Sequence, residues 1–126
     1  MSLQWSVENS MDDVRRQNRD VHNENPAEEL NYHGQLNDTA NPYQGKSYGY
    51  PTCVTAWNTA DLGNNALKVG DQFIPNLAAG QDAATADAAC AQFQAPRLVF
   101  PSHTAPLDIK FSKNGTAAYV SFHGSW

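Results

Sequence analysis

The residues of this sequence that could take part in chemistry are its carboxylates, its histidines and its cysteines. Glu28 and Glu29 form an adjacent acidic pair. Neighbouring residues in a strand point to opposite faces, so these carboxyls cannot flank one glycosidic bond as the acid and base of a glycosidase do. We therefore expect structural roles for both. The histidines are His22, His33, His103 and His123. Their spacing does not match H-x-x-x-H or a comparable zinc motif, and His22 and His33 fall in segments expected to be polar loops.

Two cysteines accompany two glycosylation sequons, which begin at Asn37 and Asn114. Together they indicate an oxidising, extracellular compartment and favour a Cys53–Cys90 disulfide. In the chain-entropy model such a bond stabilises the fold by roughly 4 kcal/mol. Two buried free thiols are the alternative. Metal ligation is less favoured, because neither cysteine belongs to a C-x-x-C pair.

Composition and charge argue against a nucleic-acid partner and against a membrane-spanning segment. Charged residues make up 17% of the chain and the formal net charge is −5, which argues against a nucleic-acid partner. We interpret the basic cluster of Arg15, Arg16 and Arg19 as a solvated face, because acidic residues flank it. No segment approaches the roughly 18 apolar residues that cross a bilayer. The first residues do not resemble a signal peptide, and we interpret residues 1–3 as an added leader before an internal start.

The clearest elements lie near the C-terminal end. Apolar residues alternate with polar ones over residues 107–112 and 117–124, and Lys113-Asn114-Gly115 lies between them. This pattern predicts an antiparallel hairpin with one buried face. A two-stranded ribbon is marginally stable alone, so we expect further strands beside it. The sequence ends at Ser125-Trp126, before such strands arrive.

The preceding segments predict less regular structure. Residues 4–7 have the pattern of a strand end, and residues 12–25 are interpreted as an irregular loop. Residues 58–95 form a long, low-charge insertion. Cys53 and Cys90 bracket most of this insertion, and a bond between them would hold it in place.

Several stretches taken together carry a family resemblance. In order they are WSVENSMDD, NPAEELNYHG, SYGYPTC, APRLVFPSHTAPLDIKFS and AAYVSFHGSW. As a set they resemble the middle of a fungal glucose/sorbosone dehydrogenase-like protein, from the family of soluble, pyrroloquinoline quinone (PQQ)-dependent sugar dehydrogenases built on a six-bladed β-propeller. The resemblance implies an all-β fold: residues 1–126 would be a fragment of one propeller domain, with about two four-stranded blades plus the 58–95 insertion.

The resemblance also implies PQQ and calcium as cofactors. Calcium accepts backbone carbonyl ligands and would act on the quinone as a Lewis acid. By position, Asn9 and Ser10 are the residues expected at the metal, and Glu8 is expected to contact PQQ or the metal. Bacterial members of the family have Gly-Pro where this chain has Asn9-Ser10, which puts the ligand atoms in doubt. An ordinary acidic turn is the alternative.

Three further residues are expected at PQQ by the same resemblance. His123 would donate a hydrogen bond, Trp126 would stack on the flat ring, and His103 would face the channel. The alternative places Trp126 in a blade core and pairs His123 with backbone. Ser47 stands where the family's Asn-Tyr-Gly-Tyr-Pro signature has its asparagine, which puts that side-chain hydrogen bond in doubt.

The implied function is part of a secreted PQQ- and calcium-dependent dehydrogenase that oxidises an aldose or ketoaldose. Its partners would be the sugar, an electron acceptor and the remaining propeller blades, with no nucleic acid and no membrane. No residue matches the family's histidine base, so we assign no catalytic residue and expect the fragment to be inactive alone. The alternatives are a non-catalytic propeller segment that binds carbohydrate or protein, and a small disulfide-stapled β-domain of unrelated function.

Overall fold

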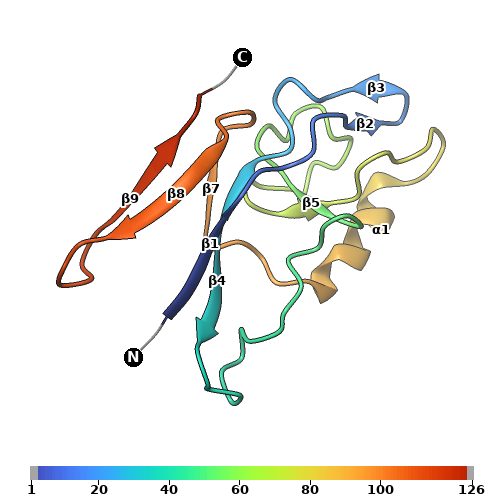
Figure 1. The fold of residues 1–126 in the computed structure, drawn as a ribbon. Coiled ribbons are helices and arrows are strands. Elements are labelled where there is room, and N and C mark those ends of the chain that lie inside the picture. Colours follow the sequence, from blue (N-terminus) through green and yellow to red (C-terminus); the bar gives the residue numbers. More distant parts are fainter. Residues whose placement is uncertain (1–2, 125–126) are drawn as a thin grey trace.

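The computed structural model describes residues 3–124 and consists mostly of short antiparallel strands. The strands are β1 (Leu3–Glu8), β2 (Arg15–Arg16), β3 (Arg19–Asp20), β4 (Glu28–Gln35), β5 (Val54–Thr55), β6 (Gln72–Phe73), β7 (Leu98–Phe100), β8 (Pro106–Phe111) and β9 (Ala118–Phe122). One α-helix, α1 (Ala83–Asp87), continues into a 3-10 helix (Ala88–Gln92). In Figure 1, the sheet of β1, β4 and β7 lies between the β8–β9 ribbon and the part of the chain that carries β2, β3, β5 and α1.

The central sheet has β4 in the middle, paired with β1 on one side and β7 on the other. One face of the β1–β4 pair is apolar, because Trp5 lies opposite Tyr32 and Val7 opposite Leu30. The Trp5 and Tyr32 rings pack with their centroids 4.7 Å apart. The strand expected at residues 4–7 is therefore confirmed, and it is longer than predicted.

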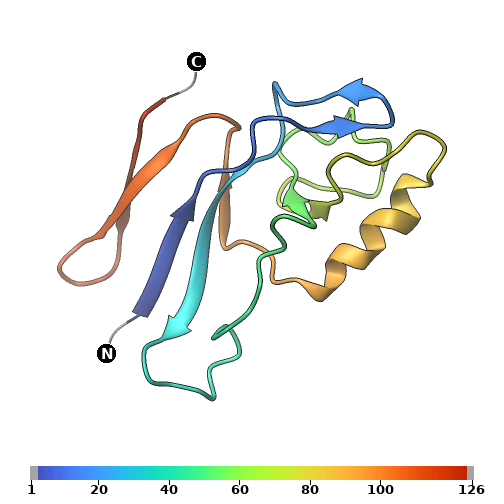
Figure 2. The ribbon, with the colours of Figure 1, turned by 45° about the vertical axis from the view of Figure 1, so that its right-hand side comes forward.

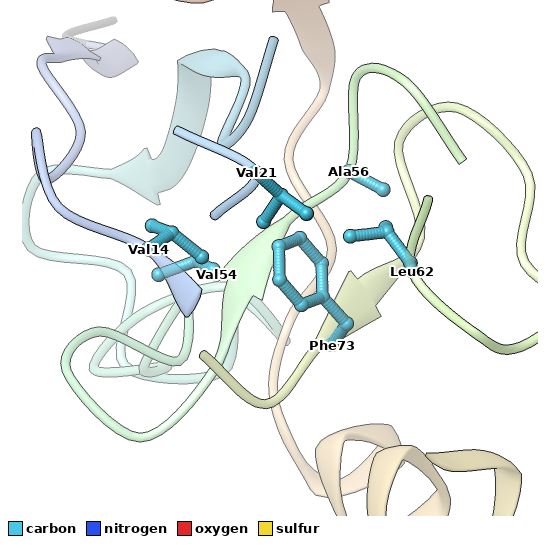
Figure 3. Packing of buried hydrophobic residues seen from close by; sticks show 6 residues of the cluster. All are labelled: Val14, Val21, Val54, Ala56, Leu62 and Phe73. Atoms are coloured by element: carbon cyan, nitrogen blue, oxygen red, sulfur yellow. The ribbon is translucent and has the colours of Figure 1, made fainter. Parts of the chain in front are cut away.

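The hydrophobic core lies beside this sheet, not within it (Figure 3). It consists of Val14, Val21, Val54, Ala56, Leu62 and Phe73. Val14 and Val21 flank the β2–β3 hairpin and are joined by a 3.0 Å hydrogen bond from Val21 N to Val14 O. Gln17 (φ 50°) and Asn18 (φ 67°) are both left-handed, as a tight hairpin turn requires. The prediction of an irregular loop over residues 12–25 missed this hairpin, because its apolar residues are too few to show a period.

Arg16 is the clearest departure from the sequence analysis. It was expected on a solvated face, but its side chain is fully buried and forms a two-pronged ion pair with Asp87 (Nη1–Oδ1 2.8 Å, Nη2–Oδ2 3.0 Å). The guanidinium also donates to the carbonyls of Leu62 and Ile74, and lies 5.2 Å from the centre of the Phe73 ring. A buried charge needs such partners, and the sequence alone does not reveal a partner 71 positions away.

The insertion over residues 58–95 is not structureless. Cys53 and Cys90 form a disulfide, as the sequence indicated. Within the insertion lie β6, α1 and the 3-10 helix, and Asp82 caps α1 by accepting a 2.8 Å hydrogen bond from Thr85 N. Figure 2 shows this helical segment packed on the side of the molecule away from β8 and β9. Over residues 3–124, no helix is long and apolar enough to cross a membrane.

The predicted C-terminal hairpin is confirmed, whereas the predicted blades are wrong. β8 and β9 pair antiparallel on either side of the Asn114-Gly115 turn, with Ile109 opposite Val120. However, the residues that the structure describes form one three-stranded sheet and three two-stranded sheets, and no four-stranded blade. The hairpin face expected to be buried is only partly covered: Leu107 is 61% exposed and Phe111 45% exposed, although the Phe111 ring lies 5.7 Å from that of Trp5. The fold is thus mostly β with small sheets, because no third strand of the described chain pairs with β8 or β9.

Candidate functional site

The second face of the β1–β4 pair is polar. Residues directly opposite each other in an antiparallel pair share a face, as do residues two apart along a strand. Because Ser6 lies opposite Asn31 and Glu8 opposite Glu29, these four side chains and that of His33 lie on one face.

Two members of this face, the half-buried acid Glu29 and the buried amide Asn31, form a hydrogen-bonded pair. Glu29 accepts hydrogen bonds from Thr55 Oγ1 (2.6 Å) and from Asn31 Nδ2 (2.9 Å). Burial raises the pKa of Glu29; the two hydrogen bonds oppose this rise, while the negative charges of Glu8 and Glu28 add to it. Asn31 is only 1% exposed, and its Oδ1 has no hydrogen-bond partner. The pair therefore presents an acceptor that still lacks a donor.

A second hydrogen-bonded group on this face joins Glu8, Ser6 and His33. Ser6 Oγ donates to Glu8 Oε1 (2.5 Å) and contacts His33 Nε2 (2.6 Å). The serine therefore stands between the acid and the imidazole. In a Ser-His-Asp triad the histidine occupies the middle position, so this arrangement is not that of a serine hydrolase.

Except for Ser6, the polar residues of this face line a pocket of about 390 Å³, which we call the sheet-face pocket. Its other wall includes Tyr48, Tyr50 and Val54, from the segment that leads into β5. The Tyr48 ring packs edge-on against His33, with centroids 5.2 Å apart. The remaining lining residues are Glu8, Asn9, Ser10, Glu29, Asn31 and Cys53.

Glu28 points to the opposite side of β4, as the alternation of strand residues requires. Its Oε2 accepts a 2.7 Å hydrogen bond from Ser10 N, and it also accepts from the backbone of His103 and Ala105. Burial raises the pKa of Glu28, and these backbone donors oppose the rise. Glu28 thus has the structural role expected of it, because it holds the segment after β1 against the segment before β8.

A second pocket, of about 300 Å³, lies at this junction; we call it the loop pocket. Asn9, Ser10, His103 and His123 all line it, although they are distant in sequence. Asn9 Nδ2 donates to Pro106 O (3.2 Å), and His123 N donates to Ala105 O (2.9 Å).

The structure therefore brings together four of the residues named from the sequence. Glu8 is separated from His103 and His123, because it lines only the sheet-face pocket, whereas Asn9 and Ser10 line both pockets. Trp126 lies outside the described residues.

The sequence analysis missed the sheet-face pocket. His33 was expected in a polar loop, yet it belongs to β4. Glu29, Asn31 and His33 recur at every second position, and that spacing is the signal that could have revealed a polar strand face. The signal is weak because only Leu30 and Tyr32 alternate as apolar residues in β4.

The two sequons lie on the surface of the described chain. Asn37 follows β4 and Asn114 lies in the turn between β8 and β9, and both are exposed.

Comparison with known proteins shows the family. The TrAA12-like family matches residues 2–126. The chain belongs to this family. It is 57% identical over 125 residues to a pyrroloquinoline quinone-dependent sugar dehydrogenase of Hypocrea jecorina (strain QM6a), covering 96% of this chain and 27% of that protein. It is 42% identical over 127 residues to a pyrroloquinoline quinone-dependent pyranose dehydrogenase of Coprinopsis cinerea, covering 96% of this chain and 16% of that protein.

Two solved structures are also similar to this TrAA12-like chain. The calcium structure of Trichoderma reesei Carbohydrate-Active Enzymes Family AA12 has a TM-score of 0.83 at 55% identity, over 96% of this chain and 29% of that one. The holo form of the pyranose dehydrogenase PQQ domain from Coprinopsis cinerea has a TM-score of 0.78 at 38% identity, over 99% of this chain and 32% of that one. The chain thus spans less than a third of each relative's length.

These findings correct the family and the function expected from the motifs. The stretches that suggested a glucose/sorbosone dehydrogenase-like protein lie within the range matched by the TrAA12-like family. The expected function, a fragment of the propeller of a PQQ- and calcium-dependent dehydrogenase, is wrong as stated, because the family is TrAA12-like and residues 3–124 form no four-stranded blade.

Proposed function

We propose that this chain serves as the TrAA12-like domain of a PQQ-dependent sugar dehydrogenase. Support comes from its similarity to two proteins that are named as PQQ-dependent sugar and pyranose dehydrogenases. The structural observation that carries the proposal is the loop pocket. There, Asn9 and Ser10 meet His103 and His123 from the other end of the chain.

The oxygen atoms available at the loop pocket fit a calcium ion. Ser10 N donates to Glu28 and Asn9 Nδ2 donates to Pro106 O, so two nitrogen donors of this segment already have protein partners. The segment therefore offers oxygen atoms to a ligand, and oxygen is what calcium binds. Asp12 and Glu28 add negative charge at the same pocket.

The residues that line the loop pocket fit PQQ only together with a cation. PQQ carries three carboxylates, whereas the residues lining the loop pocket include no lysine and no arginine. Acidic groups would repel the bare anion, and a calcium ion at Asn9 and Ser10 would reverse that repulsion. The exposed His123 imidazole can donate to quinone or carboxylate oxygens, whereas His103 Nε2 is already hydrogen-bonded to His22 O and so shapes the pocket wall.

The residues of this chain would bind and orient PQQ and the calcium ion. When bound, PQQ supplies a quinone that accepts two electrons from the sugar, and calcium supplies the Lewis acid that polarises it. Asn9 and Ser10 would present oxygens to the metal and His123 would donate a hydrogen bond to PQQ, while Glu28 holds the Asn9–Ser10 segment by accepting from Ser10 N.

The test is a titration of the full chain with PQQ, in the presence and absence of calcium, followed by the quinone absorbance. We expect calcium-dependent binding that His123→Ala weakens about tenfold, the usual effect of losing a hydrogen bond to a charged group. Tyr119→Ala is the control, because Tyr119 is exposed and does not line the loop pocket. Binding without calcium, or equal effects of both variants, would refute the assignment.

The partners proposed for the parent enzyme are a sugar and an electron acceptor, and the compartment proposed is extracellular. The Cys53–Cys90 disulfide and the exposed Asn37 and Asn114 support secretion. Mass spectrometry of the chain secreted from a eukaryotic host should show glycans that Asn37→Gln and Asn114→Gln remove one by one. A secreted chain of unmodified mass would count against this proposal.

A further inference from the structure

The sheet-face pocket is rich in hydrogen-bond acceptors and negative charge. Glu8 and Glu29 contribute carboxylates, and Asn31 contributes an amide oxygen. The residues that line the pocket include no lysine and no arginine. Its chemistry is therefore complementary to a ligand that donates hydrogen bonds and carries positive charge.

Asn31 Oδ1 gives the most specific indication of a ligand. Asn31 is nearly completely buried and lines the pocket, and its amide nitrogen is held by Glu29 at 2.9 Å. That hydrogen bond fixes the orientation of the amide and leaves Oδ1 without a partner. Most buried polar atoms in proteins are hydrogen-bonded, so an exception calls for a donor from outside the chain.

A neutral hydrogen-bond donor would not offset the repulsion between the carboxylates of Glu8 and Glu29. Glu8 and Glu29 are opposite each other in the β1–β4 register, and their like charges oppose the ionisation of Glu29. A water molecule would satisfy Asn31 Oδ1 but would leave this repulsion in place. A bound cation would remove it, because an opposite charge nearby favours the ionised form of a carboxyl group.

The aromatic wall favours an organic cation over a metal ion. Tyr48 and Tyr50 supply rings, whose faces attract ammonium groups and pack against carbon. Tyr50 is 68% exposed and can pack against an incoming ligand at the pocket mouth.

We propose that the sheet-face pocket binds a small organic cation with a primary ammonium group, of the class that includes amino sugars. The ammonium donates to Asn31 Oδ1 and Glu29, Glu8 adds long-range attraction, and the tyrosines contact the carbon skeleton. The sheet-face pocket shares Asn9 and Ser10 with the loop pocket, but Glu8, Glu29 and Asn31 line only the sheet-face pocket, and the inference does not rest on the function proposed above.

The test compares three probes that differ at one position: glucosamine, N-acetylglucosamine and glucose. Binding to the full chain is measured by isothermal titration calorimetry and by amide NMR shifts at fixed ionic strength. We expect glucosamine to bind at least about tenfold more tightly than the other two, because only it carries the ammonium. Shifts should centre on β4 and on residues 48–54.

Carboxylate-to-amide variants distinguish binding in the sheet-face pocket from attraction to the overall negative charge of the chain. Glu29→Gln keeps the shape of the side chain and should weaken glucosamine binding about tenfold or more. Glu24→Gln, which removes a carboxylate outside the sheet-face pocket, should leave binding unchanged. If Glu29→Gln does not fold, Glu8→Gln decides the matter, because Glu8 is exposed and should still weaken binding several-fold. Equal affinity for glucosamine and glucose, no glucosamine binding, or equal effects of Glu8→Gln and Glu24→Gln would each overturn the proposal.

Discussion

Replacing Asp87 by alanine should strongly destabilise this domain. The Arg16 side chain is 0% exposed, and Asp87 accepts two hydrogen bonds from it, at 2.8 and 3.0 Å. Asp87 also accepts from Asn64 Nδ2 (3.0 Å) and from Ile74 N (2.9 Å). Asp87→Ala leaves a guanidinium buried without its counter-charge, which lowers the free energy of unfolding by about 3–5 kcal/mol. Two further donors also lose their acceptor, so we expect a value at the upper end of that range.

The assay is urea unfolding followed by the fluorescence of the three tryptophans. Asp61→Ala is the matched control, because Asp61 pairs with Arg19 on the surface and exposed pairs contribute only about 0–1 kcal/mol. The double variant Arg16→Met with Asp87→Leu removes both charges and should be far more stable than Asp87→Ala alone. A loss below about 1 kcal/mol for Asp87→Ala, or equal losses for Asp87→Ala and Asp61→Ala, would show that Arg16 is not buried as described.

Two further predictions concern stability. Burial raises the pKa of Glu29 above the ordinary value of 4.5. The stability it contributes is therefore complete below pH 4.5 and is lost as the pH rises through the higher folded-state value, so Glu29→Gln should gain stability relative to the native chain between pH 4 and 7; a difference independent of pH would contradict this. Replacing Cys53 and Cys90 by alanine should lower the free energy of unfolding by about 4 kcal/mol in the chain-entropy model, because the disulfide links residues 37 apart; a loss below about 1 kcal/mol in urea would contradict it.

The strands that could be predicted are those with many alternating apolar residues. β1 and the β8–β9 hairpin follow this rule, and the alternation that revealed them reflects the side-chain period of a strand. Their partners could not be predicted in the same way. β7 joins β4 through Val99 opposite Glu29, a pairing of residues 70 positions apart in sequence that no local pattern encodes.

The buried charge could not be predicted for a related reason. Arg15 and Arg16 are neighbours of the same type, yet Arg15 is exposed and Arg16 is buried. The difference arises because β2 places alternate residues on opposite faces, and only one face meets the insertion that carries Asp87. Interpreted as a loop insertion held by the disulfide, residues 58–95 offer Arg16 no defined partner, and the flanking acidic residues then favour a solvated face.

The position of Asn9 and Ser10 explains why the sequence located one candidate site better than the other. Most residues of the loop pocket lie just before or after strands, where ligand-binding residues often gather, and the family resemblance, not their types, suggested their role. The sheet-face pocket depends on the register that places Glu8 opposite Glu29, and a shift by one residue would turn its polar side chains to the apolar face. Register follows from pairing and cannot be read from either strand alone. A polar residue at every second position of a central strand, such as Glu29, Asn31 and His33, is therefore worth testing as a binding surface in other sequences before it is assigned to a loop.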